Sequence, residues 1–163
     1  MESNYILGLD ISLTSTGYAV VELFEDGSFK LTECGRIRTY SKDADGVRLL
    51  KISLKIEELI TKYDIGYVVR ERGFTGGSPL STQQIFKATG VIEKTLAMHQ
   101  LTEIHQIAPT SIKKLLTGNG RASKDDVARA VDIYFPATVW ESDDVSDAVA
   151  CILSLLKQKG IIN

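Results

Sequence analysis

The chain has 163 residues, of which 44% are hydrophobic and 25% charged, and its formal net charge is -2 at pH 7. This size fits one domain over residues 1–163 and is too small for two substantial lobes, while the aliphatic content excludes a disordered chain. No apolar stretch reaches the roughly 20 residues of a membrane span and the start has no signal region, so we expect a cytoplasmic protein.

Three strands are predicted first, at residues 5–11, 17–23 and 28–38, with the Asp-Gly turn of "FEDGS" between the last two. Helical periodicity then runs from 46 to about 63, and "DIGYVVRE" predicts a fourth strand. The loop "RGFTGGSP" leads into a long helix at 80–99 and a short strand, "EIHQIA". Three further helices are predicted, at 109–117, after an N-cap at Ser123, and at 144–159.

This order predicts an α/β fold in which helices flank a mixed sheet of five strands. The helix at 46–63 is long enough for a right-handed crossover, which would place the strand of "IGYVVRE" parallel to the first strand and next to it. Asp10 and Glu71 would then meet at the carboxyl edge of the sheet, where open sheets bind ligands.

The first strand, "YILGLD", is apolar until it ends on Asp10. A carboxylate at the end of a buried strand is costly unless it is paired, hydrogen-bonded or bound to a cation. The alternative is an Asx-type turn, in which Asp10 accepts hydrogen bonds from backbone amides near Ser12.

Three more carboxylates begin or end apolar elements. Glu71 closes the fourth strand; the alternative is that Arg70-Glu71-Arg72 is simply an exposed strand end with alternating charges. Asp144 and Asp147 share one face of the last helix; the alternative is that they only stabilise the first turn of that helix, where acidic residues are favoured by the helix dipole. Together with Asp10 they form a set of hard oxygen ligands without a His or Cys cluster, which suits magnesium or manganese.

The segments "YILGLDISLTSTGYAVVE", "HQIAPTSIKKLLTGNGRASKDDVARAV" and "DDVSDAVACIL", with Glu71 followed by Phe74, resemble the RuvC family of Holliday junction resolvases, of the phage type. The resemblance runs from about residue 6 to 156 with the motifs in the family's order. Two departures are Ile11-Ser12 in place of Pro-Gly, and the arginines on both sides of Glu71.

The resemblance implies an RNase H-like fold, a homodimer, and nicking of DNA at four-way junctions. Three-way and fork DNA are further candidate substrates, and we expect nicks with 5′-phosphate and 3′-hydroxyl ends. Asp10, Glu71, Asp144 and Asp147 would hold Mg²⁺, with Mn²⁺ as a substitute. Two divalent ions roughly 4 Å apart can activate water and stabilise the leaving oxygen. A non-catalytic binder of branched DNA, or a nuclease of this fold acting on structured RNA, stays open, and a phage-encoded protein would work in the host cytoplasm.

Residues 70–124 carry 8 bases and 3 acids, a surplus of +5 in an acidic protein. The surplus predicts a phosphate-binding face, although ordinary solvated Lys and Arg would give the same count. By resemblance, lysines 113 and 124 contact DNA and Phe74 stacks on an unpaired base, while Lys114 and Arg121 lie in the same basic segment. Paired nicks require two active sites, so we expect a dimer through the apolar faces of the helices at 80–99 or 45–63.

Overall fold

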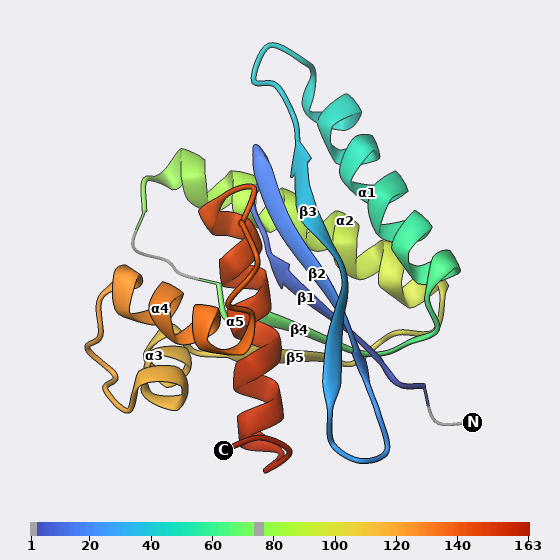
Figure 1. The fold of residues 1–163 in the computed structure, drawn as a ribbon. Coiled ribbons are helices and arrows are strands. Elements are labelled where there is room, and N and C mark those ends of the chain that lie inside the picture. The colour runs from blue at the N-terminus through green and yellow to red at the C-terminus, as the bar shows by residue number, and fades with distance from the viewer. Residues whose placement is uncertain (1–2, 74–76) are drawn as a thin grey trace.

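The computed structural model describes residues 3–73 and 77–163, which form one mixed sheet covered by helices (Figure 1). The strand order in the sheet is β3-β2-β1-β4-β5. The strands are β1 (Tyr5–Asp10), β2 (Ser15–Leu23), β3 (Phe29–Arg38), β4 (Ile65–Glu71) and β5 (Ile104–Ile107). The helices are α1 (Asp45–Lys62), α2 (Pro79–Met98), α3 (Pro109–Thr117), α4 (Lys124–Tyr134) and α5 (Asp143–Gln158).

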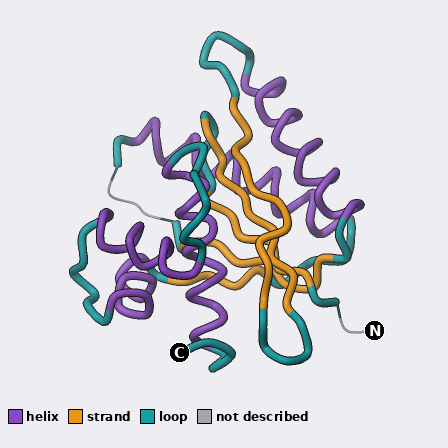
Figure 2. Tube along the Cα trace, in the orientation of Figure 1, coloured by secondary structure: helices purple, strands orange, loops and turns teal. Residues whose placement is uncertain are grey.

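The predicted α/β fold with a five-stranded mixed sheet is confirmed, and the helices and strands follow the expected order (Figure 2). Strands β1, β2 and β3 form an antiparallel meander, while β4 pairs with β1 in parallel and β5 with β4 in parallel. Helix α1 makes the crossover from β3 to β4, as expected. Among the described residues, no helix is both long and apolar enough to cross a bilayer.

The helices form two layers on opposite faces of the sheet (Figure 1). One layer contains α5 together with α3 and α4, and its core includes Val149, Ile152 and Leu156 of α5. The other contains α1 and α2, with Ile56 and Ile92 in its core. The sheet is therefore covered on both faces, which explains the continuous apolar run of β1.

Helix α5 lies directly on the backbone of β1 and β2 at two glycines. A Cβ atom added at Gly17 would lie 1.9 Å from the carbonyl oxygen of Asp144, and one added at Gly8 would lie 2.4 Å from that of Ala148. No side chain fits at these distances. The two glycines therefore set how closely the start of α5 approaches the end of the sheet where β1 finishes.

Helix α1 presents apolar residues on two faces. Ile52, Ile56 and Leu59 are completely buried against the sheet, as the helical period predicts. Val47, Leu50 and Leu54, which have helical spacing of their own, are 56–59% exposed. We call these three residues the α1 stripe. Periodicity predicted the helix, but only the packing separates its core face from this exposed face.

Helix α4 begins as the sequence predicts. The Ser123 hydroxyl accepts a hydrogen bond from the Asp126 amide, and the Asp126 carboxylate accepts one from the Ser123 amide. This reciprocal capping box holds the start of α4, so it fixes the position of Lys124, the first residue of the helix.

Candidate active site

Asp10 and Glu71 end two strands that lie side by side. Strands β1 and β4 run parallel, with Leu9 opposite Arg70. The next residue of each strand is the carboxylate, so Asp10 and Glu71 lie at the same edge of the sheet, as predicted. The crossover through α1 produces this arrangement, because it returns the chain in the direction of β1.

The other two predicted carboxylates come from the start of α5. Asp144 and Asp147 lie three residues apart, so they occupy one side of the helix. The Ser15 hydroxyl, at the start of β2, donates a hydrogen bond to Oδ2 of Asp144 over 2.6 Å. The close contact of α5 with Gly17 brings this turn of the helix onto the sheet edge that carries Asp10.

The four carboxylates are close enough to affect one another electrostatically. Burial, together with the negative charges of Asp147, Asp144 and Glu71, raises the pKa of Asp10 to about 7, against a smaller opposing effect of Lys124. Burial and the charge of Asp147 also raise the pKa of Glu71. Such a cluster is unfavourable as bare anions and favourable around a cation.

The Asx-turn alternative for Asp10 is wrong. The Ser12 amide donates to Oγ1 of Thr16 at 3.3 Å, and the turn between β1 and β2 is closed by Ser12, Ser15 and Thr16. Among the described residues, no donor forms a hydrogen bond with the Asp10 carboxylate. Asp10 therefore has no local structural role that would account for its position.

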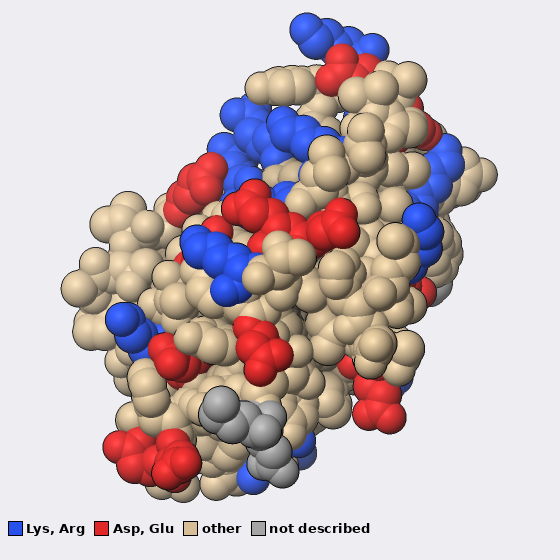
Figure 3. Space-filling model, turned by 90° about the vertical axis from the view of Figure 1, so that its right-hand side faces the viewer, with Lys and Arg blue, Asp and Glu red and all other residues tan. Residues whose placement is uncertain are grey.

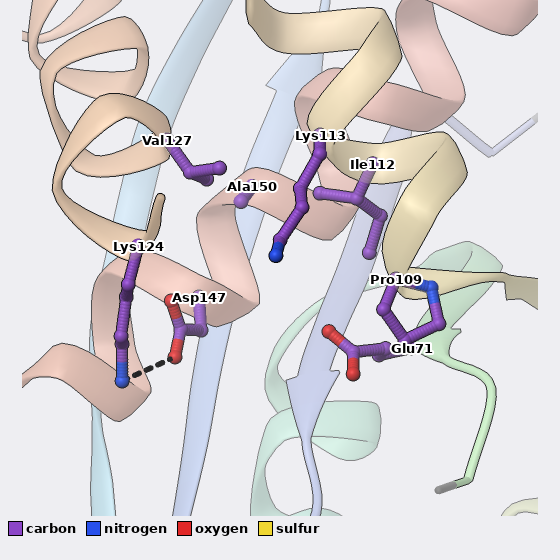
Figure 4. Close-up of a pocket in the computed structure, with 8 residues that line it drawn as sticks. All are labelled: Glu71, Pro109, Ile112, Lys113, Lys124, Val127, Asp147 and Ala150. Carbon is purple, nitrogen blue, oxygen red and sulfur yellow. Dashed lines mark ion pairs between the residues drawn. The ribbon is translucent and has the colours of Figure 1, made fainter. Parts of the chain in front are cut away.

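A pocket of about 430 Å³ opens beside the carboxylates. Its walls are Glu71, Pro109, Ile112, Lys113, Lys124, Val127, Asp147 and Ala150 (Figure 4). The Lys113 side chain points into the space between the carboxylates of Asp147 and Glu71, and Lys124 Nζ lies 3.2 Å from Asp147. Acids from the sheet and α5 thus face ammonium groups from α3 and α4 across one opening, an arrangement suited to a phosphate bound with a cation.

The donor set suits a hard divalent cation, because every one of its members is a carboxylate. In the described part of the chain, no three Asp, Glu, His or Cys side chains stand in a geometry ready to hold a metal ion. Lys124 Nζ pairs instead with both Asp147, at 3.2 Å, and Asp143, at 3.5 Å. The chemistry of the residues therefore fits a cation, whereas their side-chain positions are those of a lysine-paired site.

The remaining predicted DNA-binding residues lie outside the pocket. Lys114 is exposed on α3, and Arg121 is exposed in the turn between α3 and α4, where its amide donates to Oδ1 of Asn119 at 2.9 Å. Phe74 lies outside the described residues. The structure thus gathers lysines 113 and 124 at the carboxylates and leaves Lys114 and Arg121 at the surface.

Two neighbours of the carboxylates were not recognised in the sequence. Ser15 is one, and the hydroxyl-rich run "SLTST" was its only signal. Arg70 is the other, since it is 9% exposed, its Nη1 donates to the Glu71 carbonyl at 3.2 Å, and its Nη2 lies 3.6 Å from Glu93. The alternative of an exposed strand end is therefore wrong for Arg70, whereas Arg72 is exposed.

Comparisons with known proteins identify the family of this chain. The family model described as "Crossover junction endodeoxyribonuclease RuvC" matches residues 6–154. A protein of that name from Orientia tsutsugamushi is 34% identical over 145 residues, which cover 89% of this chain and 90% of the relative. The one from Brachyspira hyodysenteriae is 29% identical over 157 residues, 96% of each chain.

Solved structures share the fold. T. thermophilus RuvC in complex with Holliday junction substrate matches with a TM-score of 0.87 and 19% identity, over 95% of this chain and 94% of that one. The yeast mitochondrial Holliday junction resolvase Ydc2 matches with a TM-score of 0.68 and 12% identity, over 98% of this chain and 80% of that one. The fold described above is thus the RNase H-like fold of these nucleases.

Proposed function

The chain belongs to the RuvC family of crossover junction endodeoxyribonucleases, and on this premise we propose that it resolves Holliday junctions by magnesium-dependent nicking at the Asp10 edge of the sheet. The observation that carries this assignment of the site is the meeting of Asp10 and Glu71, from adjacent parallel strands, with Asp144 and Asp147 from α5. Membership of this family favours an active nuclease for branched DNA over the alternatives of a non-catalytic binder and of a nuclease for structured RNA.

Hydrolysis of a phosphodiester requires a positioned water, relief of charge on the phosphoryl oxygens and a stabilised leaving oxygen. Divalent ions held by Asp10, Glu71, Asp144 and Asp147 would supply this chemistry, with Mg²⁺ as the native ion and Mn²⁺ as a substitute. The raised pKa values of Asp10 and Glu71 support this ligand set, because a bound cation would offset the repulsion that raises them.

The two pocket lysines would hold the substrate phosphate. Lys124 is fixed at the start of α4 by the capping box, and Lys113 enters the same pocket from α3 (Figure 4). Either ammonium group can donate to a phosphoryl oxygen and offset its charge. Arg121, Lys114 and Phe74 would bind DNA further from the reacting phosphate, the first two by charge and Phe74 by stacking.

Resolution into two duplexes requires two active sites, so we propose a two-fold symmetric homodimer. The α1 stripe supports it, because Val47, Leu50 and Leu54 form one exposed apolar row, and α2 beside it exposes Phe86 (60%) and Met98 (65%). Exposed apolar rows of this kind mark protein interfaces.

The test is incubation of the purified protein with end-labelled four-way, three-way and duplex DNA, each with and without Mg²⁺. We expect paired nicks on opposed strands of the four-way junction, with ligatable ends, only when the metal is present. Nicking of plain duplex at the same rate would contradict junction selectivity, and undiminished nicking in a chelator would contradict the metal site.

A further inference from the structure

Three cationic side chains surround the exposed ring of Tyr40, which follows the end of β3. Arg38 Cζ lies 5.9 Å from the ring centre, Lys42 Nζ 5.9 Å and Lys51 Nζ 5.7 Å. Tyr40 itself is 51% exposed. We call Arg38, Tyr40, Lys42 and Lys51 the Tyr40 patch. It combines a concentrated positive charge with an accessible aromatic ring and hydroxyl.

The positive charge of the patch is only partly offset by neighbouring acids. In the described part of the chain, none of the three cations forms an ion pair with a carboxylate. Of the nearby acids, Glu141 pairs with Arg36 at 3.1 Å and Asp45 pairs with Lys87 at 2.6 Å. Asp43 lies in the same turn, where its amide donates to the Tyr40 carbonyl at 3.0 Å, so three cations face one acid and the patch keeps a positive surplus. An aromatic ring attracts cations without cancelling their charge, so the patch is suited to binding an anion.

The backbone that carries the patch is held by a buried arginine. Arg48, 4% exposed, donates from Nε to Oγ1 of Thr39 and from Nη2 to Oγ1 of Thr14, each over 3.0 Å. The Thr39 amide also donates to the Thr14 carbonyl at 2.9 Å. The end of β3, the turn before β2 and the start of α1 are therefore tied together, and the side chains of the patch project from a fixed base.

The patch lies at the same end of the sheet as the carboxylates. Arg38 is the register partner of Ser15, whose hydroxyl binds Asp144. A surface groove of about 280 Å³, lined by Arg36, Ile37, Arg38, Lys51, Lys55 and Glu141, runs beside the patch. Glu141 precedes Asp144 by three residues, so this groove leads from the patch to the segment that begins α5.

The face of the molecule that carries α1 shows the same distribution of charge. Lys and Arg outnumber acids at its upper end in Figure 3, the height at which β3 leads into α1 in Figure 1, although acidic atoms lie beside the topmost basic side chains, and acids are more frequent lower down. The positive end is thus shared by the edge strand and the start of α1.

We propose that the Tyr40 patch binds the sugar-phosphate backbone of a duplex arm of the DNA substrate, away from the phosphodiester that is cut. This inference rests on the proposed function. Duplex DNA carries about one charge per 1.7 Å of its axis, so a cluster of three cations meets several phosphates at once. The Tyr40 hydroxyl offers a further donor to a phosphate oxygen. Binding of this kind does not require any side chain to contact a base.

The experiment measures binding of a four-way junction in Ca²⁺, at several salt concentrations, by fluorescence anisotropy. Lys42→Gln and Lys51→Gln should each flatten the plot of log affinity against log salt by about one unit, and the double variant by about two. Lys30→Gln is the matched control, because Lys30 is exposed on the same strand at its opposite end. The control should keep the wild-type slope.

Two further measurements separate a DNA contact from a structural role. The melting temperature of the free Lys51→Gln variant should not fall, because the change removes a repelling charge. The effect on affinity should grow with arm length and vanish for junctions with arms too short to reach the patch. An effect equal to that of Lys30→Gln, or independent of arm length, would overturn the inference.

Nicking of junctions by the wild type in Mg²⁺ tests the proposed function independently of the patch variants. If the wild type nicks junctions while the patch variants bind with unchanged salt slopes, only the Tyr40 patch inference fails. A wild type that neither binds nor nicks junctions would overturn both.

Discussion

The Ser15 hydroxyl donates to Oδ2 of Asp144 over 2.6 Å, joining residues that are 129 positions apart in the sequence. Ser15 is itself held, since its amide donates to Oγ of Ser12 at 3.0 Å and its carbonyl accepts from the same hydroxyl at 2.8 Å. The turn between β1 and β2 thus orients a carboxylate on α5, which places Ser15 as a positioning residue for the proposed metal site.

Ser15→Ala should weaken metal binding about tenfold, because loss of an outer hydrogen bond to a ligand typically costs 10–100-fold in metal affinity. Calorimetric titration of Mn²⁺ measures this directly, without DNA. Ser15→Thr keeps the hydroxyl and is the conservative control. Equal Mn²⁺ affinity in Ser15→Ala and the wild type would contradict the positioning role.

Asp10→Asn, Glu71→Gln and Asp147→Asn should each abolish nicking in Mg²⁺ while junction binding stays near that of the wild type. Each change removes a metal ligand and leaves the basic residues in place. Nicking assays and gel shifts with the same labelled junction separate the two effects. Survival of nicking in all three variants would disprove the ligand set.

Gly17→Ala should lower the free energy of unfolding by about 1–3 kcal/mol and reduce nicking, because a Cβ atom at this position meets the backbone of Asp144. The start of α5 must then move off the sheet, taking both of its carboxylates with it. Urea unfolding and single-turnover nicking measure the two effects. Gly90→Ala is the control, since a Cβ there meets nothing within 4 Å.

Leu50→Glu should convert the proposed dimer into a monomer, because it places a charge in the middle of the α1 stripe, where Leu50 is 58% exposed. Sedimentation at micromolar concentration measures the change. Val139→Glu is the matched control, since Val139 is 96% exposed outside the helices. A monomeric wild type that still makes paired nicks would refute the dimer.

Glu33 should make the stability of the fold depend on acid pH. Burial alone would raise its pKa, but hydrogen bonds from Lys62, Tyr63 and Lys55 outweigh burial and lower the pKa from an ordinary 4.5 to about 2. Because the folded-state pKa is depressed, this stabilisation is complete above about pH 4.5 and is lost as the pH falls toward 2.

The measurement for Glu33 is urea unfolding of the wild type and Glu33→Gln between pH 7 and pH 3, spanning most of that window. The difference in the free energy of unfolding should be largest near neutral pH and shrink below the ordinary carboxyl pKa. A difference that stays constant down to pH 3 would show that the ion pairs of Glu33 contribute nothing to this pH dependence.

The sequence by itself determined the elements, the sheet order around β1 and the meeting of Asp10 with Glu71. The elements follow from local periodicity, and the sheet order follows from the right-handed crossover rule, which places Asp10 next to Glu71. Both rules hold in most proteins. The order of the motifs, through the resemblance to the RuvC family, also singled out Asp144 and Asp147 as candidate metal ligands. The assignment of all four carboxylates to metal binding, and a single domain over residues 1–163, stay predictions.

The tertiary structure alone decided which side chains meet across long separations. Nothing local to Ser15 or Arg70 marks the one as a partner of Asp144 or the other as buried against Glu71 and α2. The Tyr40 patch likewise combines residues of β3, the turn that follows it and α1. A count of charged residues along the sequence therefore does not reveal that these cations lie together. Such contacts arise only when packed layers set the distances between elements, because a side chain reaches only a few ångströms from its own backbone.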